Sequence, residues 1–191
     1  MQKHIQSYAA RLANALSLNA FDVLPSLIEG LSEAWKNDKT IFFCGNGGSA
    51  GNAIHLANDF IYGAGLGYGK GLRVEALSAN PAVLTCLAND IGYENIFSEQ
   101  IRVKGNVGDV LIVLSGSGNS PNILKVLETG NALGLKTFAV LGFDGGKAKV
   151  LDQFPIHFPV QDMQISEDLQ LIVGHMCMQW LCANPPQEKS T

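Results

Sequence analysis

Hydrophobic residues in the first part of the chain recur at spacings of three and four residues, the period of an amphipathic helix. Two such stretches cover residues 4–19 and 21–36. In the second stretch, Leu24, Leu27 and Leu31 share one face. The sequence therefore predicts two helices ahead of the rest of the chain.

After residue 39 the pattern changes to short apolar runs, which are typical of strands buried on both faces. These runs are 40–44, 73–78, 109–115, 136–142 and 154–159. Segments of helical character lie between and after them: 49–62, 81–104, 121–133, 146–152 and 165–183. Strands that alternate with helices predict an α/β fold, in which helices cover both faces of one parallel sheet.

The chain length and composition suit a single domain. With 191 residues and 47% hydrophobic content, the chain can bury a substantial core. We predict one domain over 1–183. The polar, proline-containing segment 184–191 has too little apolar surface to offset the entropy of ordering, so we expect it to be a flexible tail.

Charge and hydropathy narrow the classes of partner. The 13 basic and 17 acidic residues give a net charge of −4, which argues against a broad surface for direct nucleic-acid binding. The apolar runs are too short to span a bilayer, and the first residues lack the continuous apolar core of a signal peptide. We therefore expect a soluble, cytoplasmic protein without a membrane partner.

The four cysteines lie in apolar surroundings and lack the C-x-x-C spacing of a zinc ribbon or a redox pair. They are Cys44, Cys86, Cys177 and Cys182. We expect all four to be buried free thiols rather than disulfide or catalytic cysteines.

Two connections between a strand and a helix are rich in glycine and serine. The first reads C-G-N-G-G-S-A at 44–50, and the second reads S-G-S-G-N-S at 115–120, just before Pro121. Ligands of open parallel sheets bind beyond the carboxyl ends of the strands. Serine hydroxyls and N–H groups at a helix start can bind an oxyanion without a lysine. The two loops therefore predict a neutral phosphate-binding site.

The alternative is that both loops are simple connections, because glycine and serine are common in turns. Three serines within 115–120, between an apolar strand and Pro121, favour phosphate binding. Neither loop matches G-x-x-x-x-G-K-[ST] or the full G-x-G-x-x-G, so a nucleotide cofactor is not expected. A small phosphomonoester is the better ligand class.

Two helices carry residues that could perform chemistry. His55 and Asp59 are four residues apart, so an imidazole and a carboxylate share one face and could bind a substrate or a metal. Glu167 and His175 are eight residues apart, on neighbouring faces of the last helix. His175 interrupts an apolar stretch, and it is either a functional residue or a hydrogen-bonded histidine of the core or an interface.

Four segments together resemble the sugar isomerase (SIS) family, and in particular its sedoheptulose 7-phosphate isomerase branch. They are GNGGSAGNAIHLANDF, LANDIGYENIFSEQI, LSGSGNSPNIL and SEDLQLIVGHMCMQWL. The resemblance covers nearly the whole chain. It implies a flavodoxin-like three-layer αβα sandwich with a five-stranded parallel sheet and a homotetramer to which the helical segment 1–36 contributes. It also implies conversion of sedoheptulose 7-phosphate to D-glycero-D-manno-heptose 7-phosphate.

Several positions match the substrate site of that family. The substrate-binding residues that the resemblance implies are Asn46, Gly47, Ser49, Asn89, Asp90, Ser115, Gly116, Ser117, Ser120 and Glu167. The serines of the second loop match the phosphate-binding serines. The Asn-Asp pair matches residues that line the sugar site.

The resemblance also implies a metal centre and a catalytic pair. A zinc-like divalent ion is expected at His55, Asp59, Glu167 and His175. Asp59 and His175 are expected to act as acid and base through an enediol, and the sequence leaves open which residue has which role.

Three positions depart from the family pattern. Asp59 replaces the usual glutamate and is one methylene shorter, Glu167 replaces a glutamine, and Gly116 replaces a threonine found in many relatives. The extra charge of Glu167 could favour a divalent ion and repel an anionic substrate.

Two other functions remain open at this point. One is a non-catalytic adaptor on the same fold, such as the replication-initiator-binding relative, which generally lacks the histidine pair that His55 and His175 provide here. The other is an isomerase of a different phosphosugar, because the loops specify the phosphate better than the carbon skeleton.

Overall fold

The structure is a computed structural model, and it describes residues 1–186. Five parallel strands form one sheet in the order β2-β1-β3-β4-β5. The strands are β1 (Thr40–Gly45), β2 (Arg73–Ala76), β3 (Val110–Ser115), β4 (Lys136–Leu141) and β5 (Phe154–His157). This is the flavodoxin-like order, so the predicted α/β fold is confirmed.

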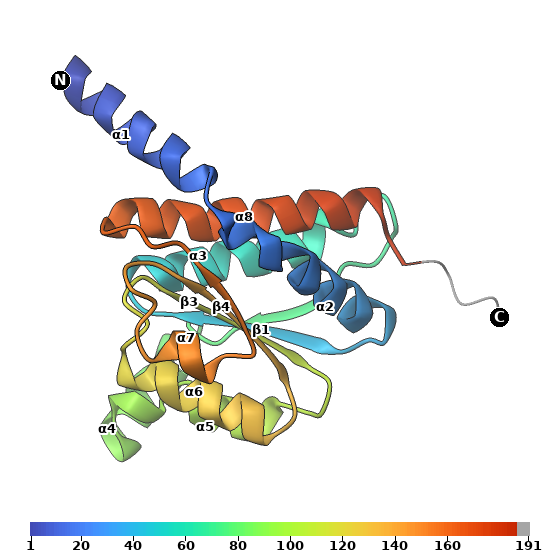
Figure 1. The fold of residues 1–191 in the computed structure, drawn as a ribbon. Helices are drawn as coiled ribbons and strands as arrows, with labels where there is room; N and C mark the ends of the chain where they lie inside the picture. The colour runs from blue at the N-terminus through green and yellow to red at the C-terminus, as the bar shows by residue number, and fades with distance from the viewer. Residues whose placement is uncertain (187–191) are drawn as a thin grey trace.

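Helices cover both faces of the sheet (Figure 1). One layer contains α2 (Leu24–Lys36), α3 (Gly48–Asn58) and α8 (Met163–Ala183). The opposite layer contains α4 (Pro81–Ile91), α5 (Ser98–Lys104), α6 (Pro121–Ala132) and α7 (Ala148–Leu151). Short helical turns connect them: η1 (Asn19–Val23), η2 (Asp59–Gly63) and η3 (Tyr93–Asn95).

Helix α1 (Gln2–Leu16) extends away from the sheet, beyond the layer of α2, α3 and α8 (Figure 1). Ala15 is its one fully buried residue. The Tyr8 hydroxyl donates a 2.5 Å hydrogen bond to Asp168 on α8, which raises the pKa of Tyr8 to about 12. Arg11 forms a 3.1 Å ion pair with Asp162, the residue that caps α8. Polar contacts to the start of α8 therefore hold α1.

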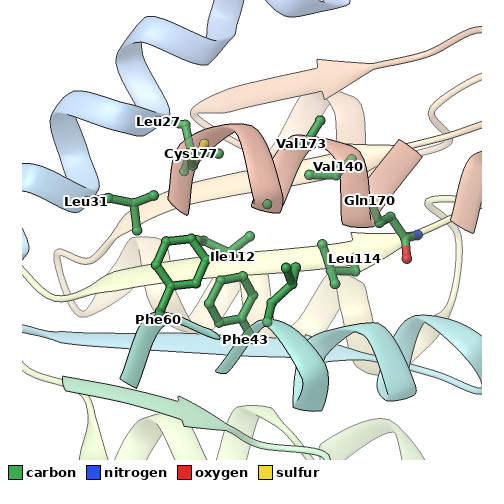
Figure 2. A pocket seen from close by; sticks show the side chains of 12 residues that line it. Leu27, Leu31, Phe43, Phe60, Ile112, Leu114, Val140, Gln170, Val173 and Cys177 are labelled. Atoms are coloured by element: carbon green, nitrogen blue, oxygen red, sulfur yellow. The ribbon is translucent and has the colours of Figure 1, made fainter. Parts of the chain in front are cut away.

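The central strands are buried because successive side chains enter opposite layers. Ile41 and Phe43 pack toward α2, α3 and α8, whereas Phe42 and Cys44 pack toward α5 and α6. Figure 2 shows the first core, where Phe43 and Phe60 lie beneath α8. The cavity inside this core has a volume of about 10 Å³, which is room for one water at most. This cavity is therefore not the substrate site.

The prediction of one continuous helical segment over 81–104 was wrong. The segment is divided into α4, η3 and α5, and Gly92 ends α4 with a φ of 92°. A positive φ is cheap for glycine because it has no Cβ. The apolar spacing continues past the break into the buried Ile96 and Ile101, which made the segment look like one helix.

The prediction of four buried thiols was correct for two cysteines and wrong for the others. Cys44 and Cys177 are buried, and burial raises the pKa of the Cys177 thiol to about 12 and also raises the pKa of Cys44. Cys86 and Cys182 are exposed. Cys86 lies on α4, in which no residue is fully buried, and Cys182 lies in the last turn of α8.

Helix α8 ends at Ala183, where the flexible tail was predicted to begin. The part of that tail over 187–191 lies outside the described residues, so its flexibility remains a prediction. Within residues 1–186, none of the helices combines the length and the apolar character that crossing a bilayer requires.

Candidate active site

The two glycine- and serine-rich loops meet at one edge of the sheet. They follow β1 and β3, which are neighbours at the point where the strand order reverses. A hollow of about 250 Å³ opens there, lined by Asn46, Gly47, Gly48, Ser49, Leu114, Ser115, Gly116, Ser117, Ser120, Met163 and Glu167. The structure thus brings together all the predicted substrate-binding residues except Asn89 and Asp90.

The second loop directs hydroxyl groups into this hollow. Ser115 Oγ accepts a 3.1 Å hydrogen bond from the N–H of Gly118, and Ser117 Oγ accepts a 3.3 Å bond from the N–H of Asn119. Ser120 is the N-cap residue of α6, but its side chain makes no capping bond. Each hydroxyl therefore keeps its own hydrogen for a bond to an anion.

The first loop begins α3 and is joined to α8 by a hydrogen-bond network. The buried Ser49 hydroxyl accepts a 3.0 Å bond from Gln170 Nε2. Asn52 Nδ2 donates to Gln170 Oε1 at 3.0 Å and to the backbone oxygen of Glu167 at 2.9 Å. Sequence reasoning missed Asn52 and Gln170, because they act through contacts between helices far apart in the chain.

A reciprocal amide pair connects the two loops. Asn46 Nδ2 donates to Asn122 Oδ1 at 2.9 Å, and Asn122 Nδ2 donates to Asn46 Oδ1 at 2.8 Å. The Tyr93 hydroxyl also donates to Asn46 Oδ1, at 3.0 Å. Asn122 is 1% exposed, and no sequence signal marks it, because its burial and its partner are set by the tertiary fold. These bonds fix the orientation of Asn46 at the hollow.

The departure from the family pattern at Gly116 has a local explanation. A Cβ at Gly116 would lie 2.6 Å from the sulfur of Met163, the first residue of α8. Met163 also lines the hollow. Its side chain thus occupies the space that a threonine at position 116 would need.

The structure places Asn89 and Asp90 on α4, outside the residues that line the hollow. Both are exposed, and Asn89 Nδ2 donates a 2.7 Å bond to Asp90 Oδ1. Tyr93, just after α4, reaches the hollow through its bond to Asn46. Sugar binding by Asn89 and Asp90 stays a prediction.

A second group of functional side chains lies where α3 passes α8. His55 Nε2 and His175 Nε2 are 3.1 Å apart, and each is 3.4 Å from Asp59 Oδ2. Helix α3 changes there into a π-helical turn that begins at Asp59, and such turns are frequent at functional sites. The spacing of His55 and Asp59 correctly predicted a shared face.

This group has the donor atoms of a metal site. Two imidazole nitrogens and one carboxylate oxygen lie within 4.8 Å of one another, a donor set that suits zinc and similar ions. Glu167, the fourth predicted ligand, is not part of this group. Its carboxylate lies over Gly48 instead, where a Cβ would collide with both carboxylate oxygens.

The hollow and the histidine group share the same two helices. His55 lies seven residues beyond Gly48 on α3, and His175 lies eight residues beyond Glu167 on α8. At 1.5 Å per residue these separations are about 10 and 12 Å. One elongated ligand could therefore place an anion in the hollow and its other end at the histidines.

Comparison with known proteins agrees with this geometry. Residues 4–142 match the SIS domain family. The chain is 38% identical to a phosphoheptose isomerase of Clostridium acetobutylicum over 80% of this chain and 78% of that one. It is 36% identical to one of Helicobacter pylori (strain P12) over 92% and 91%.

A solved structure gives the same result. The phosphoheptose isomerase GmhA from Neisseria gonorrhoeae superposes with a TM-score of 0.85 at 27% identity, covering 95% of this chain and 98% of that one. The fold, the serine loop at its switch point and these relatives agree. The chain therefore belongs to the SIS domain family, within which these relatives are phosphoheptose isomerases.

Proposed function

We propose that this protein is an aldose-ketose isomerase that converts sedoheptulose 7-phosphate to D-glycero-D-manno-heptose 7-phosphate. The observation that carries the proposal is the pairing of an anion-binding hollow with the His55, Asp59 and His175 group along α3 and α8. The similarity to phosphoheptose isomerases supports an isomerase over the non-catalytic adaptor and selects the seven-carbon sugar among phosphosugars.

The substrate phosphate would bind at the serine loop. The hydroxyls of Ser115, Ser117 and Ser120 donate to its oxygens, and the start of α6 adds a favourable dipole. Among residues 1–186, none of those that line the hollow is a lysine or an arginine. Neutral donors hold the anion without the desolvation cost of a buried cation.

Asp59 and His175 would move the protons. One group removes the proton from C1 of the ketose while the other delivers a proton to the C2 carbonyl oxygen, which gives the enediol. Return of a proton to C2 and loss of the proton from the C1 hydroxyl form the aldose. Asp59 Oδ2 lies 3.4 Å from His175 Nε2, so both groups can reach adjacent substrate atoms.

Asp59 and His175 also belong to the candidate metal site, so each would serve both as a metal ligand and as a proton-transfer group. His55, Asp59 and His175 would hold a divalent metal, and three protein ligands leave a position open for the substrate. When bound, a zinc-like ion would polarise the substrate carbonyl.

We further propose that the protein is a cytoplasmic homotetramer formed by one domain over 1–183. The first helix supports this assembly, because α1 extends from the body and exposes Ile5 and Leu16. The segment 1–36 would then contribute contacts between subunits.

The experiment is a turnover assay with sedoheptulose 7-phosphate, read as formation of the aldose. We expect turnover by the parent protein and a loss of about 100-fold or more in Asp59→Asn and His175→Ala. Asp22→Asn, which removes an exposed carboxyl on η1, serves as the control and keeps the parental rate. A parental rate in either test variant removes that residue from the chemistry. Binding without turnover by the parent would instead identify an adaptor.

A further inference from the structure

Glu167 brings a negative charge to a hollow that otherwise suits an anion. Among the described residues that line the hollow, it is the charged one. Its carboxylate lies directly over Gly48, the first residue of α3, where a Cβ would collide with both carboxylate oxygens. The positive end of the α3 dipole stabilises a carboxylate at this place.

Hydrogen bonds hold the backbone of α8 against α3 at Glu167. Its backbone oxygen accepts from Asn52 at 2.9 Å, and one turn later Gln170 is bonded to both Asn52 and Ser49. Ser49 and Gln170 are buried, at 3% and 1% exposed. Because α8 is bonded to α3 at Glu167 and again at Gln170, the backbone that carries the carboxylate is held beside the hollow.

An ionised carboxylate treats the two parts of a phosphosugar differently. It repels a phosphate dianion that shares the hollow. It accepts hydrogen bonds and cannot donate them, so sugar hydroxyls are suitable partners. Both ligands gain the serine hydrogen bonds and experience this repulsion, but a phosphosugar also brings sugar hydroxyls that can donate to the carboxylate and offset part of the loss.

We propose that Glu167 is a specificity-determining residue that favours polyhydroxylated phosphate esters over free phosphate. This inference rests on the proposed function, since it assumes that the substrate phosphate binds at the serine loop. It gives Glu167 a role separate from the His55, Asp59 and His175 group, which its carboxylate does not join.

Calorimetric titration with inorganic phosphate and with sedoheptulose 7-phosphate tests the proposal. In Glu167→Gln, we expect affinity for inorganic phosphate to rise by about threefold or more, the scale for partly exposed charges. We expect affinity for the phosphosugar to rise less or to fall. Glu167→Asp retains the charge and should keep the weak binding of free phosphate.

The matched control is Glu29→Gln, which removes the same charge from α2. Glu29 lines a separate hollow with Trp180, 13 residues beyond Glu167 on α8 and so about 20 Å along the helix. The variant Glu29→Gln should leave the affinities for inorganic phosphate and for sedoheptulose 7-phosphate unchanged. Thermal unfolding of each variant checks that the fold is intact.

Three results would overturn the proposal. The first is unchanged or weaker phosphate binding in Glu167→Gln, and the second is an equal gain in Glu29→Gln. The third is weaker binding of Zn²⁺ alone in Glu167→Gln, which would make Glu167 a metal ligand. If the parent protein binds neither phosphate nor the phosphosugar, the proposed function fails together with the inference. If the parent protein binds both ligands and Glu167→Gln changes neither affinity, only the inference about Glu167 is refuted.

Discussion

The amide pair between Asn46 and Asn122 gives a sharp prediction about how the two ligand loops depend on each other. Asn122 is nearly fully buried, and it exchanges two hydrogen bonds of 2.9 and 2.8 Å with Asn46. A net hydrogen bond contributes about 0.5 to 1.5 kcal/mol. The pair should therefore couple the loops by about 1 to 3 kcal/mol in the free energy of unfolding.

A double-mutant cycle measures that coupling. Asn46→Ala, Asn122→Ala and the double variant are unfolded in urea, and the free energies are compared with the parent. We expect the double variant to be less destabilised than the sum of the single variants, with a difference of about 1 kcal/mol or more. Asn122→Ala should also weaken binding of the phosphosugar, although Asn122 does not line the hollow.

Additive single effects, within about 0.5 kcal/mol, would refute the reasoning because independent sites behave in that way. Thr129→Ala provides a matched control on the same helix. Its hydroxyl donates to the backbone oxygen of Lys125 within α6 and contacts neither loop. Its effect on stability should add to that of Asn46→Ala.

Three further predictions follow from burial and packing. Burial raises the pKa of Asp152 to about 6, above its unfolded value, so its folded state binds more protons and stability falls as pH rises from about 4 to about 6. In urea titrations, the fall in unfolding free energy between pH 4 and pH 7 should be about 2 to 3 kcal/mol smaller in Asp152→Asn than in the parent. The same fall in both proteins would contradict this prediction. Gly116→Thr should lower stability by about 1 kcal/mol or less, because the Met163 side chain that it displaces is flexible and exposed, and adding Met163→Ala should remove this loss in thermal unfolding. A thiol reagent should label Cys86 in the native protein and Cys44 only after unfolding, as peptide mapping would show; equal rates would contradict the burial difference.

Much of the fold followed from local pattern, because buried parallel strands and amphipathic helices have distinct hydrophobic periods. The break at Gly92 was harder to predict. A glycine inside an apolar pattern is compatible with a helix that continues, and here the core contacts of Ile96 and Ile101 preserve the pattern after the turn. Whether the helix breaks at Gly92 is decided by where α5 packs in the fold. The spacing of residues along the sequence does not give that position.

The candidate site also contains some residues that could be predicted from the sequence and others that could not. His55 and Asp59 were predictable as a pair since four residues make one helical turn, and the serine loop was predictable from its composition ahead of Pro121. The Asn46 and Asn122 pair was not, because its members are 76 residues apart and meet only when β1 and β3 become neighbours. The position of the Glu167 carboxylate was not predictable either, because it depends on how α8 crosses the start of α3. A shift of one helical turn would place the side chain at a different site.

A crystal structure of the protein with sedoheptulose 7-phosphate tests the central claim most directly. We predict electron density for the phosphate group in the hollow between the two loops, within hydrogen-bonding distance of Ser115, Ser117 and Ser120, and for the sugar chain toward His55 and His175. A phosphosugar bound elsewhere, with the serine hydroxyls free of it, would contradict the account.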